Sequence, residues 1–83
     1  MITPAQCRAA RGLLDWTQQG LADEAGVGVV TVRQFEAGDA TPRRATLRVI
    51  EQAFAKAGVE LINDSFGGPG VRLRRGRGAV GGG

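Results

Sequence analysis

The sequence lacks several of the residues on which enzyme chemistry most often depends. Its 83 residues contain no histidine, no tyrosine and only one serine, Ser65. The single cysteine, Cys7, cannot form an internal disulfide, and one cysteine without histidine cannot build a zinc site. These absences remove most routes to nucleophilic, acid–base or metal catalysis. We therefore expect a protein that is not an enzyme and that needs no cofactor.

Long apolar stretches are also missing. No segment approaches the ~20 apolar residues that a membrane-spanning helix needs, and the N-terminus does not have the charged-then-apolar pattern of a secretory signal. A chain of this length forms one small domain, which buries only about 60–65% of its unfolded surface. We expect a soluble, cytoplasmic protein with a thin core and no contact with membranes.

The charge is unevenly distributed along the chain. The net charge is +3, yet residues 1–66 contain seven basic residues against all eight acidic ones. Residues 67–83 contain four arginines and no acid. The excess positive charge therefore belongs to the C-terminal end, where it suits either a contact with nucleic acid or a solvated tail.

Helix signals dominate the first part of the chain. A threonine followed by proline starts the first predicted helix (residues 4–14), whose apolar residues recur at helical spacing. Thr17 is a good N-cap for a second helix over residues 18–25. Cys7 lies on the apolar face of the first helix and Trp16 lies between the two helices, so we expect both side chains in the core.

Residues 26–38, GVGVVTVRQFEAG, fit two different structures. Their β-branched side chains and flanking glycines are typical of a strand. A strand would place Arg33 beside Phe35 on one side, whereas a helix groups Phe35 with Val32 and turns Arg33 to the opposite face. A strand would also lack a neighbour, because only short turns join this segment to the helices around it. The pattern therefore favours a helix over residues 29–37.

A fourth helix and a hairpin are predicted for the second half of the chain. Thr41-Pro42 repeats the start signal, and apolar residues again recur at helical spacing. Residues 59–62 and 71–74 then alternate like two strands, with Glu60 facing an arginine across the pair. We expect three parts: a four-helix unit over residues 1–58, a β-hairpin over 59–75 and a flexible Gly/Arg-rich tail over 76–83.

Residues 16–42 read WTQQGLADEAGVGVVTVRQFEAGDATP. Together with the four expected helices, this segment resembles the helix-turn-helix domains of the Xre/Cro and lambda-type phage repressor family, over about residues 3–58. The resemblance implies a mainly α, four-helix lambda-repressor-like domain that binds double-stranded DNA. The following GVELIND…GGPGVRLRR is similar to the end of some small bacterial regulators of this family.

The resemblance also implies roles for individual residues. The third helix would be the recognition helix, and Arg33 and Gln34 would make bidentate hydrogen bonds to base edges in the major groove. Arg11 and Glu36 match a buried ion pair that ties the first helix to the third. The full set of implied DNA contacts is Val29, Val30, Thr31, Arg33 and Gln34 at the bases, and Gln18, Arg43 and Arg44 at the phosphates.

These observations predict a bacterial, sequence-specific transcriptional regulator, a repressor or an activator, that binds a near-palindromic operator as a homodimer. The predicted self-pairing surface is the open edge of the hairpin, and a protein partner is a further candidate for control. The apolar residues of that edge are Val59, Leu61, Val71 and Leu73. The alternative is a protein-interaction module of the antitoxin or antiactivator type. The acidic excess of residues 1–66 favours this alternative, whereas the absence of acids on the outward face of the third helix opposes it.

Overall fold

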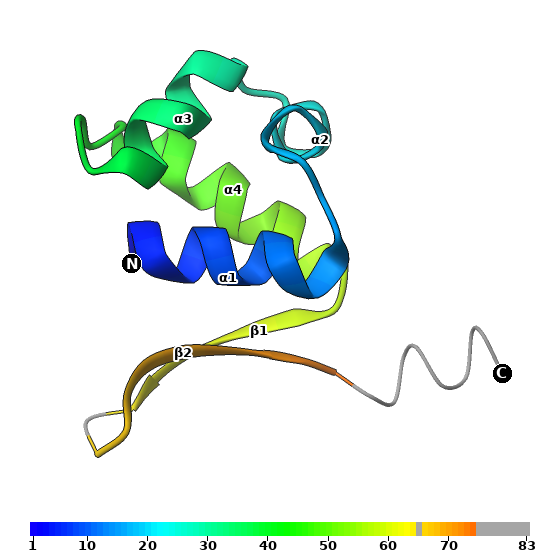
Figure 1. The fold of residues 1–83 in the computed structure, drawn as a ribbon, viewed down its shortest axis with the longest axis vertical. Helices are drawn as coiled ribbons and strands as arrows, with labels where there is room; N and C mark the ends of the chain where they lie inside the picture. Colours follow the sequence, from blue (N-terminus) through cyan, green and yellow to red (C-terminus); the bar gives the residue numbers. More distant parts are fainter. Residues whose placement is uncertain (65, 75–83) are drawn as a thin grey trace, which may run out of the picture.

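The computed structural model describes residues 1–64 and 66–74. Within them, four helices are followed by one antiparallel β-hairpin, so the mainly α fold that the sequence predicts is confirmed (Figure 1). The predicted flexible tail over residues 76–83 lies outside the described residues. In chain order the elements are α1 (Pro4–Leu14), α2 (Gln18–Ala25), α3 (Val29–Ala37), α4 (Arg44–Lys56), β1 (Val59–Asp64) and β2 (Gly68–Leu73).

The first two helices begin at the residues that their capping signals predict. The Thr3 hydroxyl accepts a hydrogen bond from the Gln6 backbone N–H (3.1 Å), and the Gln6 side-chain oxygen accepts one from the Thr3 N–H (3.0 Å). This reciprocal pair is a capping box for α1. The Thr17 hydroxyl caps α2 by accepting from the Gly20 N–H (2.9 Å). Local sequence therefore determines where α1 and α2 start.

The ambiguous segment 26–38 forms a helix, as predicted. The chain leaves α2 through Gly26 (φ 72°), starts α3 after Gly28 and leaves it through Gly38 (φ 78°). Glycine adopts these positive φ values at little cost, so both helices end in a left-handed residue. Gly28 gives α3 no side-chain cap, so α3 depends on packing more than on its own start signal.

α4 starts two residues later than predicted. The sequence predicts its N-cap at Thr41, whereas the structure places the N-cap at Arg43, which makes no side-chain capping bond. The first backbone hydrogen bond runs from the Leu47 N–H to the Arg43 carbonyl (3.0 Å). Buried Leu47 and Ile50 anchor α4 in the core, and this packing outweighs the local signal of Thr41 and Pro42. The helix is confirmed, and its predicted first residue is wrong.

All four helices contribute to one small apolar core. Its largest fully buried side chains are Phe54, Leu21, Ile50, Val32 and Cys7. The Trp16 ring stacks on the Phe54 ring, with centroids 5.8 Å apart and planes at 22°. Such stacked aromatic pairs contribute beyond the area that they bury. The prediction of a core position is therefore confirmed for Cys7, whereas Trp16 is partly buried and packs against the core from its edge.

The predicted hairpin is present, and its strands extend further toward the turn than the predicted ranges 59–62 and 71–74. The Arg72 guanidinium pairs with the Glu60 carboxylate across the strands (2.7 Å), as predicted. β1 continues to Asp64 and β2 already begins at Gly68, so both strands extend into the segment between the two predicted strands, and β2 ends at Leu73. The turn can be short because the Phe66 N–H donates to the Asp64 carboxylate (2.6 Å).

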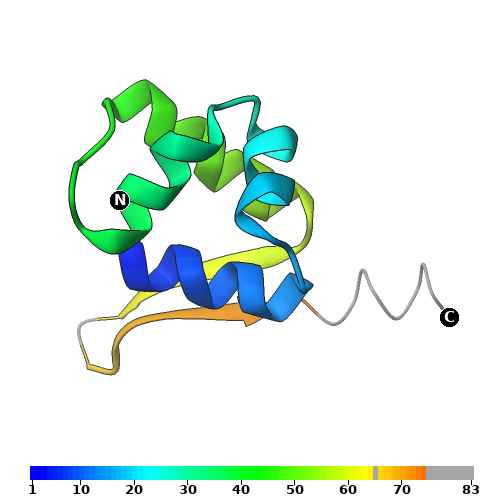
Figure 2. The same ribbon diagram turned by 45° about the horizontal axis from the view of Figure 1, so that its top comes forward.

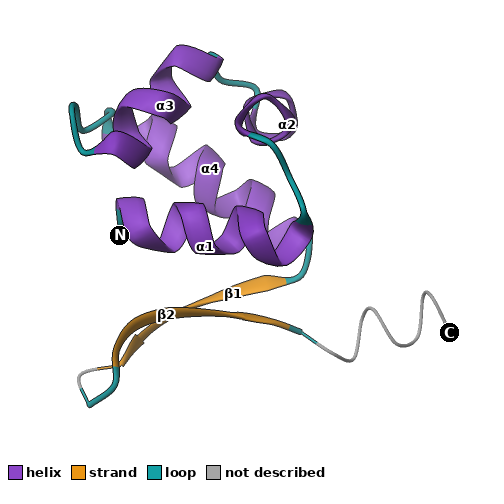
Figure 3. Cartoon of the chain, in the orientation of Figure 1, coloured by secondary structure: helices purple, strands orange, loops and turns teal. Residues whose placement is uncertain are grey.

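The hairpin lies on the side of α1 that faces away from α3 (Figures 1 and 2). The helices thus form one layer and the hairpin a second (Figure 3). Val59 is buried, and Leu61 and Val71 pack against the core. Three of the four side chains predicted for a self-pairing surface therefore cover the protein's own core. Only Leu73, 43% exposed, is open, so the prediction is wrong for the other three.

The side chain of Gln6 connects α1 to the hairpin through hydrogen bonds. Its side chain is buried, and its amide nitrogen donates to the Ile62 carbonyl (3.1 Å), the Gly70 carbonyl (3.0 Å) and the Asn63 side-chain oxygen (3.2 Å). The two amide hydrogens are shared among these three acceptors. One residue thus caps α1 and holds both strands of the hairpin.

Candidate nucleic-acid interface

α2, a three-residue turn and α3 form a helix-turn-helix unit. The backbone N–H groups of Gly26 and Val27 both donate to the Ala22 carbonyl (2.9 and 3.0 Å), which closes the turn. Val27 packs against the core and holds the turn down. In units of this kind the second helix is the one that enters the major groove of DNA, which makes α3 the candidate reading element.

The two faces of α3 have opposite character. Val32, Phe35 and Glu36 are buried, at 0%, 3% and 3% exposure. Arg33 and Gln34 are exposed, as the helical pattern predicts. Both side chains carry the donors and acceptors that can read guanine or adenine edges. The structure therefore brings the two polar candidates to one open surface.

The other three candidates on α3 differ in how exposed they are. Val30 is 55% exposed and lies on the same open surface as Arg33 and Gln34. Val29 and Thr31 are partly buried, and Val29 packs against the core. An exposed valine can contact thymine methyl groups, so Val30 has the more accessible position.

Arg43 and Arg44 lie where the loop after α3 enters α4. Arg43 is the N-cap of α4 and Arg44 its first residue, and both are exposed. Neither side chain makes a hydrogen bond or ion pair with any other residue among 1–64 and 66–74. Two exposed cations beside the candidate reading helix form a surface that suits phosphate oxygens.

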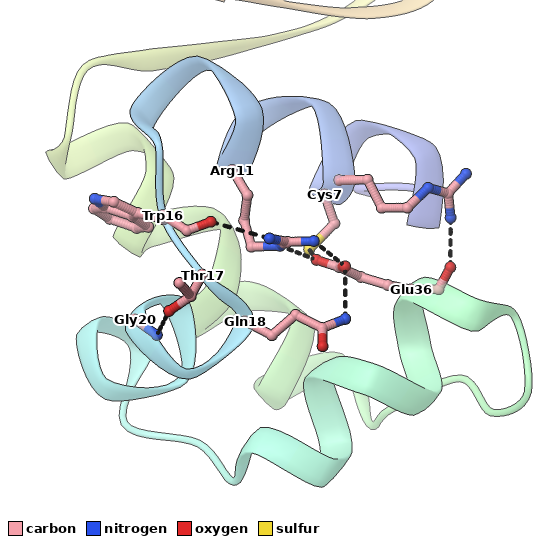
Figure 4. A network of polar contacts seen from close by, with 8 residues as sticks. Cys7, Arg11, Trp16, Thr17, Gln18, Gly20 and Glu36 are labelled. Atoms are coloured by element: carbon pink, nitrogen blue, oxygen red, sulfur yellow. Dashed lines mark hydrogen bonds and ion pairs between the residues drawn. The ribbon is translucent and has the colours of Figure 1, made fainter.

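The orientation of α3 is fixed by the buried carboxylate of Glu36 (Figure 4). Arg11 approaches it with two donors, from Nε to Oε2 and from Nη2 to Oε1, both at 2.7 Å. The Gln18 amide donates to Oε1 (3.1 Å), and the Cys7 thiol donates to Oε2 (3.1 Å). A single carboxylate on α3 is thereby bound by α1 and α2, and the predicted buried ion pair is confirmed.

Two further contacts complete this network. Arg11 also donates from Nη1 to the Trp16 carbonyl (3.0 Å), which ties the α1–α2 connection to the same guanidinium. The Arg8 guanidinium donates to the backbone carbonyl of Glu36, near the end of α3. Because planar guanidinium groups offer several fixed donors, two arginines of α1 can hold both the side chain and the backbone of one residue.

These contacts set the ionisation of the network. Burial alone would raise the pKa of Glu36, but the hydrogen bonds from Arg11, Cys7 and Gln18 and the charge of Arg11 outweigh it and lower that pKa. The hydrogen bond to Glu36 raises the pKa of Arg11, against the effect of burial. Burial, followed by the hydrogen bond to Glu36, raises the pKa of the Cys7 thiol. Glu36 is therefore charged and Cys7 is a protonated donor.

Gln18 makes a contact that the sequence does not reveal. The family resemblance implies a phosphate contact for this residue, and in the structure its amide nitrogen donates to Glu36. A side-chain amide has two N–H groups, and this contact uses one of them. The Cys7 contact is equally unforeseen, although Cys7 and Arg11 are four residues apart and such spacing places two side chains on one helix face. That spacing is the signal that could have indicated a shared acceptor.

The described part of the chain offers neither a metal site nor a membrane-spanning helix. Across residues 1–64 and 66–74, no group of three or more His, Cys, Asp or Glu side chains is arranged to hold a metal ion. No helix in this same portion is long and apolar enough to cross a bilayer.

Comparison with known proteins agrees with the geometry. A family described as helix-turn-helix matches residues 8–61, which is more than half of the chain and runs from α1 into β1. No curated protein matches the chain significantly. The matched residues include the whole α2–α3 unit and both members of the Arg11–Glu36 pair. The chain therefore belongs to the helix-turn-helix family of the Xre and lambda-repressor type, a family of DNA-binding transcription regulators.

Proposed function

We propose that this protein is a sequence-specific transcriptional regulator that binds a near-palindromic operator as a homodimer, with α3 in the major groove. In this proposal Arg33 and Gln34 hydrogen-bond to base edges, and Val30 contacts thymine methyl groups. The flanking contacts are assigned to Val29 and Thr31 in the groove and to Gln18, Arg43 and Arg44 at the phosphates.

The observation that carries the proposal is the opposite character of the two faces of α3. Its inner face is held by the Glu36 network, while its outer face presents Arg33 and Gln34 to solvent. Base reading needs side chains on a rigid element, because a small displacement breaks bidentate geometry. A helix fixed through a buried carboxylate meets that need.

We further propose that the protein represses transcription in the cytoplasm by occupying a promoter, and that its concentration or a protein partner controls occupancy. One small DNA-binding module buries little surface, so dimer formation on two half-sites supplies the missing affinity. The hairpin is the proposed dimerisation element. Its exposed apolar side chains, Phe66 and Leu73, lie near its two ends. Sedimentation analysis of a Phe66→Ser, Leu73→Ser variant checks this: a dimer that persists in this variant rules out the hairpin.

A gel-shift experiment tests the central part of the proposal, using DNA from upstream of the protein's own gene. Arg33→Ala and Gln34→Ala should each weaken binding to this DNA by about 5- to 150-fold, which corresponds to a lost bidentate base contact. Binding to unrelated DNA should stay within about twofold, because phosphate contacts are intact. Lys56→Ala and Gln52→Ala are the matched controls, since both remove an exposed side chain of α4.

One result would favour a different function. If Arg33→Ala and Gln34→Ala leave both affinity and sequence preference unchanged, α3 is not the reading helix. The protein-interaction module then becomes the better account, because the same exposed face would serve a protein partner.

A further inference from the structure

A second basic surface lies beside the candidate DNA interface and shares only Arg44 with it. It is a hollow of about 490 Å³, bounded by the first residue, the first two turns of α4 and the end of β1. The residues that line it are Met1, Arg44, Arg48, Glu51 and Asn63. Only Arg44 belongs to the DNA contacts proposed so far.

Two guanidinium groups supply the positive charge of this hollow. Arg44 and Arg48 are four residues apart on α4 and are exposed, so both reach the same side of the helix. Within residues 1–64 and 66–74, neither guanidinium group makes a hydrogen bond or an ion pair. Arg48 would ordinarily find a partner in Glu51, three residues further along the helix. That carboxylate instead accepts a hydrogen bond from the Ile2 backbone N–H (2.8 Å).

Asn63 adds a neutral donor at the opposite wall. Its side-chain oxygen already accepts a hydrogen bond from the Gln6 amide (3.2 Å), on the side of α1. An asparagine amide has an acceptor oxygen on one side and an N–H₂ donor on the other. With the oxygen held by Gln6, the N–H₂ group is the part that is left for the hollow. Oε2 of Glu51 and the side-chain oxygen of Asn63 each accept a hydrogen bond from the protein itself, while donors remain for a ligand.

We propose that this hollow binds a phosphate group through Arg44, Arg48 and Asn63. Two arginines and one amide donor can hydrogen-bond to the oxygens of a phosphate. The two positive charges of the arginines exceed the single negative charge of Glu51. Phosphate can come from the operator backbone, since the hollow adjoins Arg43 and Arg44, or from a small phosphorylated molecule. The first source rests on the proposed function, and the second does not.

The DNA source is tested by the salt dependence of binding. Each phosphate contact contributes about 0.9 to the slope of log affinity against log salt, so Arg48→Gln should lower that slope by about one unit. Affinity should fall equally for operator and unrelated DNA, unlike the sequence-selective loss expected for Arg33→Ala. Lys56→Gln is the matched control because it removes an exposed cation at the other end of α4, and it should leave the slope unchanged.

Binding of a small phosphorylated molecule is tested by adding inorganic phosphate to the full chain and recording the NMR spectrum. Phosphate should shift the Arg48 and Asn63 side-chain signals of the unmodified protein, and the Arg33 signal should stay in place. Asn63→Asp is the sharpest variant, because it keeps the acceptor for Gln6 and replaces the N–H₂ donor by a negative oxygen. It should abolish the shifts while the melting temperature stays within a few degrees.

The outcomes separate the two sources. A lowered slope for Arg48→Gln identifies the DNA backbone as the ligand. An unchanged slope with shifts that Asn63→Asp removes identifies a small phosphorylated molecule. An unchanged slope without shifts, or shifts that survive Asn63→Asp, overturns the proposal and leaves the base-reading role of α3 unaffected.

Discussion

Two arginine–glutamate pairs in this protein have the same shortest nitrogen–oxygen distance, 2.7 Å, and very different surroundings. In the helical unit, the Glu36 side chain is 3% exposed and the Arg11 side chain 20%. On the outer face of the hairpin, the Glu60 side chain is 41% exposed and that of Arg72 is 64%. The first pair also includes donors from Cys7 and Gln18, whereas the second pair stands alone in solvent.

The comparison shows that distance alone does not determine what an ion pair contributes. A charge buried with its partner cannot be rehydrated when the partner is lost, so removal of one member leaves an unpaired charge in the core. An exposed charge simply returns to water, and its pair contributes little. Glu36 therefore positions the candidate reading helix, while Glu60 contributes mainly to the local register of the hairpin.

The largest expected effect comes from Glu36→Ala. This change leaves the Arg11 guanidinium without its main partner and should lower the free energy of unfolding by about 3–5 kcal/mol, enough to unfold so small a domain. The double variant Arg11→Met, Glu36→Leu should be much milder because it removes both charges. Urea unfolding followed by circular dichroism measures both. Small and equal losses in the two variants would show that the pair does not behave as a buried one.

The second effect is a loss of stability in acid. The pKa of Glu36 is lowered in the folded protein, so its stabilising contribution is fully present above the unfolded pKa of about 4.3 and is lost as the pH falls through the folded pKa. The melting temperature should therefore drop as the pH decreases below about 4.5. The double variant Arg11→Met, Glu36→Leu, which removes both charges, should flatten this drop, and Glu60→Gln should leave it unchanged. If the melting temperature of the double variant falls as steeply with decreasing pH, other carboxylates cause the drop.

A smaller effect is expected for Cys7→Ala. This change removes the thiol that donates to Glu36 Oε2 and leaves that oxygen with Arg11 alone. Hydrogen bonds to a charged group contribute more than neutral ones, so the free energy of unfolding should fall by about 1–2 kcal/mol. Thermal unfolding at neutral pH measures the loss. A variant as stable as the unmodified protein would mean that the thiol only fills space.

The smallest effect is expected for Glu60→Ala. Since both members of the pair are exposed, the melting temperature should not change measurably, and Arg72→Ala should behave alike. A loss similar to that of Glu36→Ala would contradict the distinction between the two pairs.

The helical unit could be predicted well because its signals are local or periodic. The caps at Thr3 and Thr17 act within a few residues, and helical spacing alone separates Phe35 from Arg33. The start of α4 differs from the prediction because the burial of Leu47 in the shared core, and not the capping signal of the loop, decides between two neighbouring start positions. Capping signals in the local sequence carry no information about this packing.

The hairpin and the site networks were harder to predict for a different reason. Alternation shows that one face of β1 and β2 is apolar, but it cannot show whether that face covers α1 or a second copy. The contacts of Cys7 and Gln18 with Glu36 join residues 29 and 18 positions apart. Likewise, the Gln6 contact that orients Asn63 spans 57 positions. Such pairings appear only when the fold is known.

The central claim is that a fixed α3 reads bases through its outer face, and selection of binding sites from a random DNA library tests it most directly. The unmodified protein should enrich a near-palindromic motif, and Arg33→Ala should lose preference at one position in each half-site while the rest of the motif remains. Lys56→Ala should return the full motif. An Arg33→Ala protein that enriches the same complete motif, or an unmodified protein that enriches none, would contradict the claim.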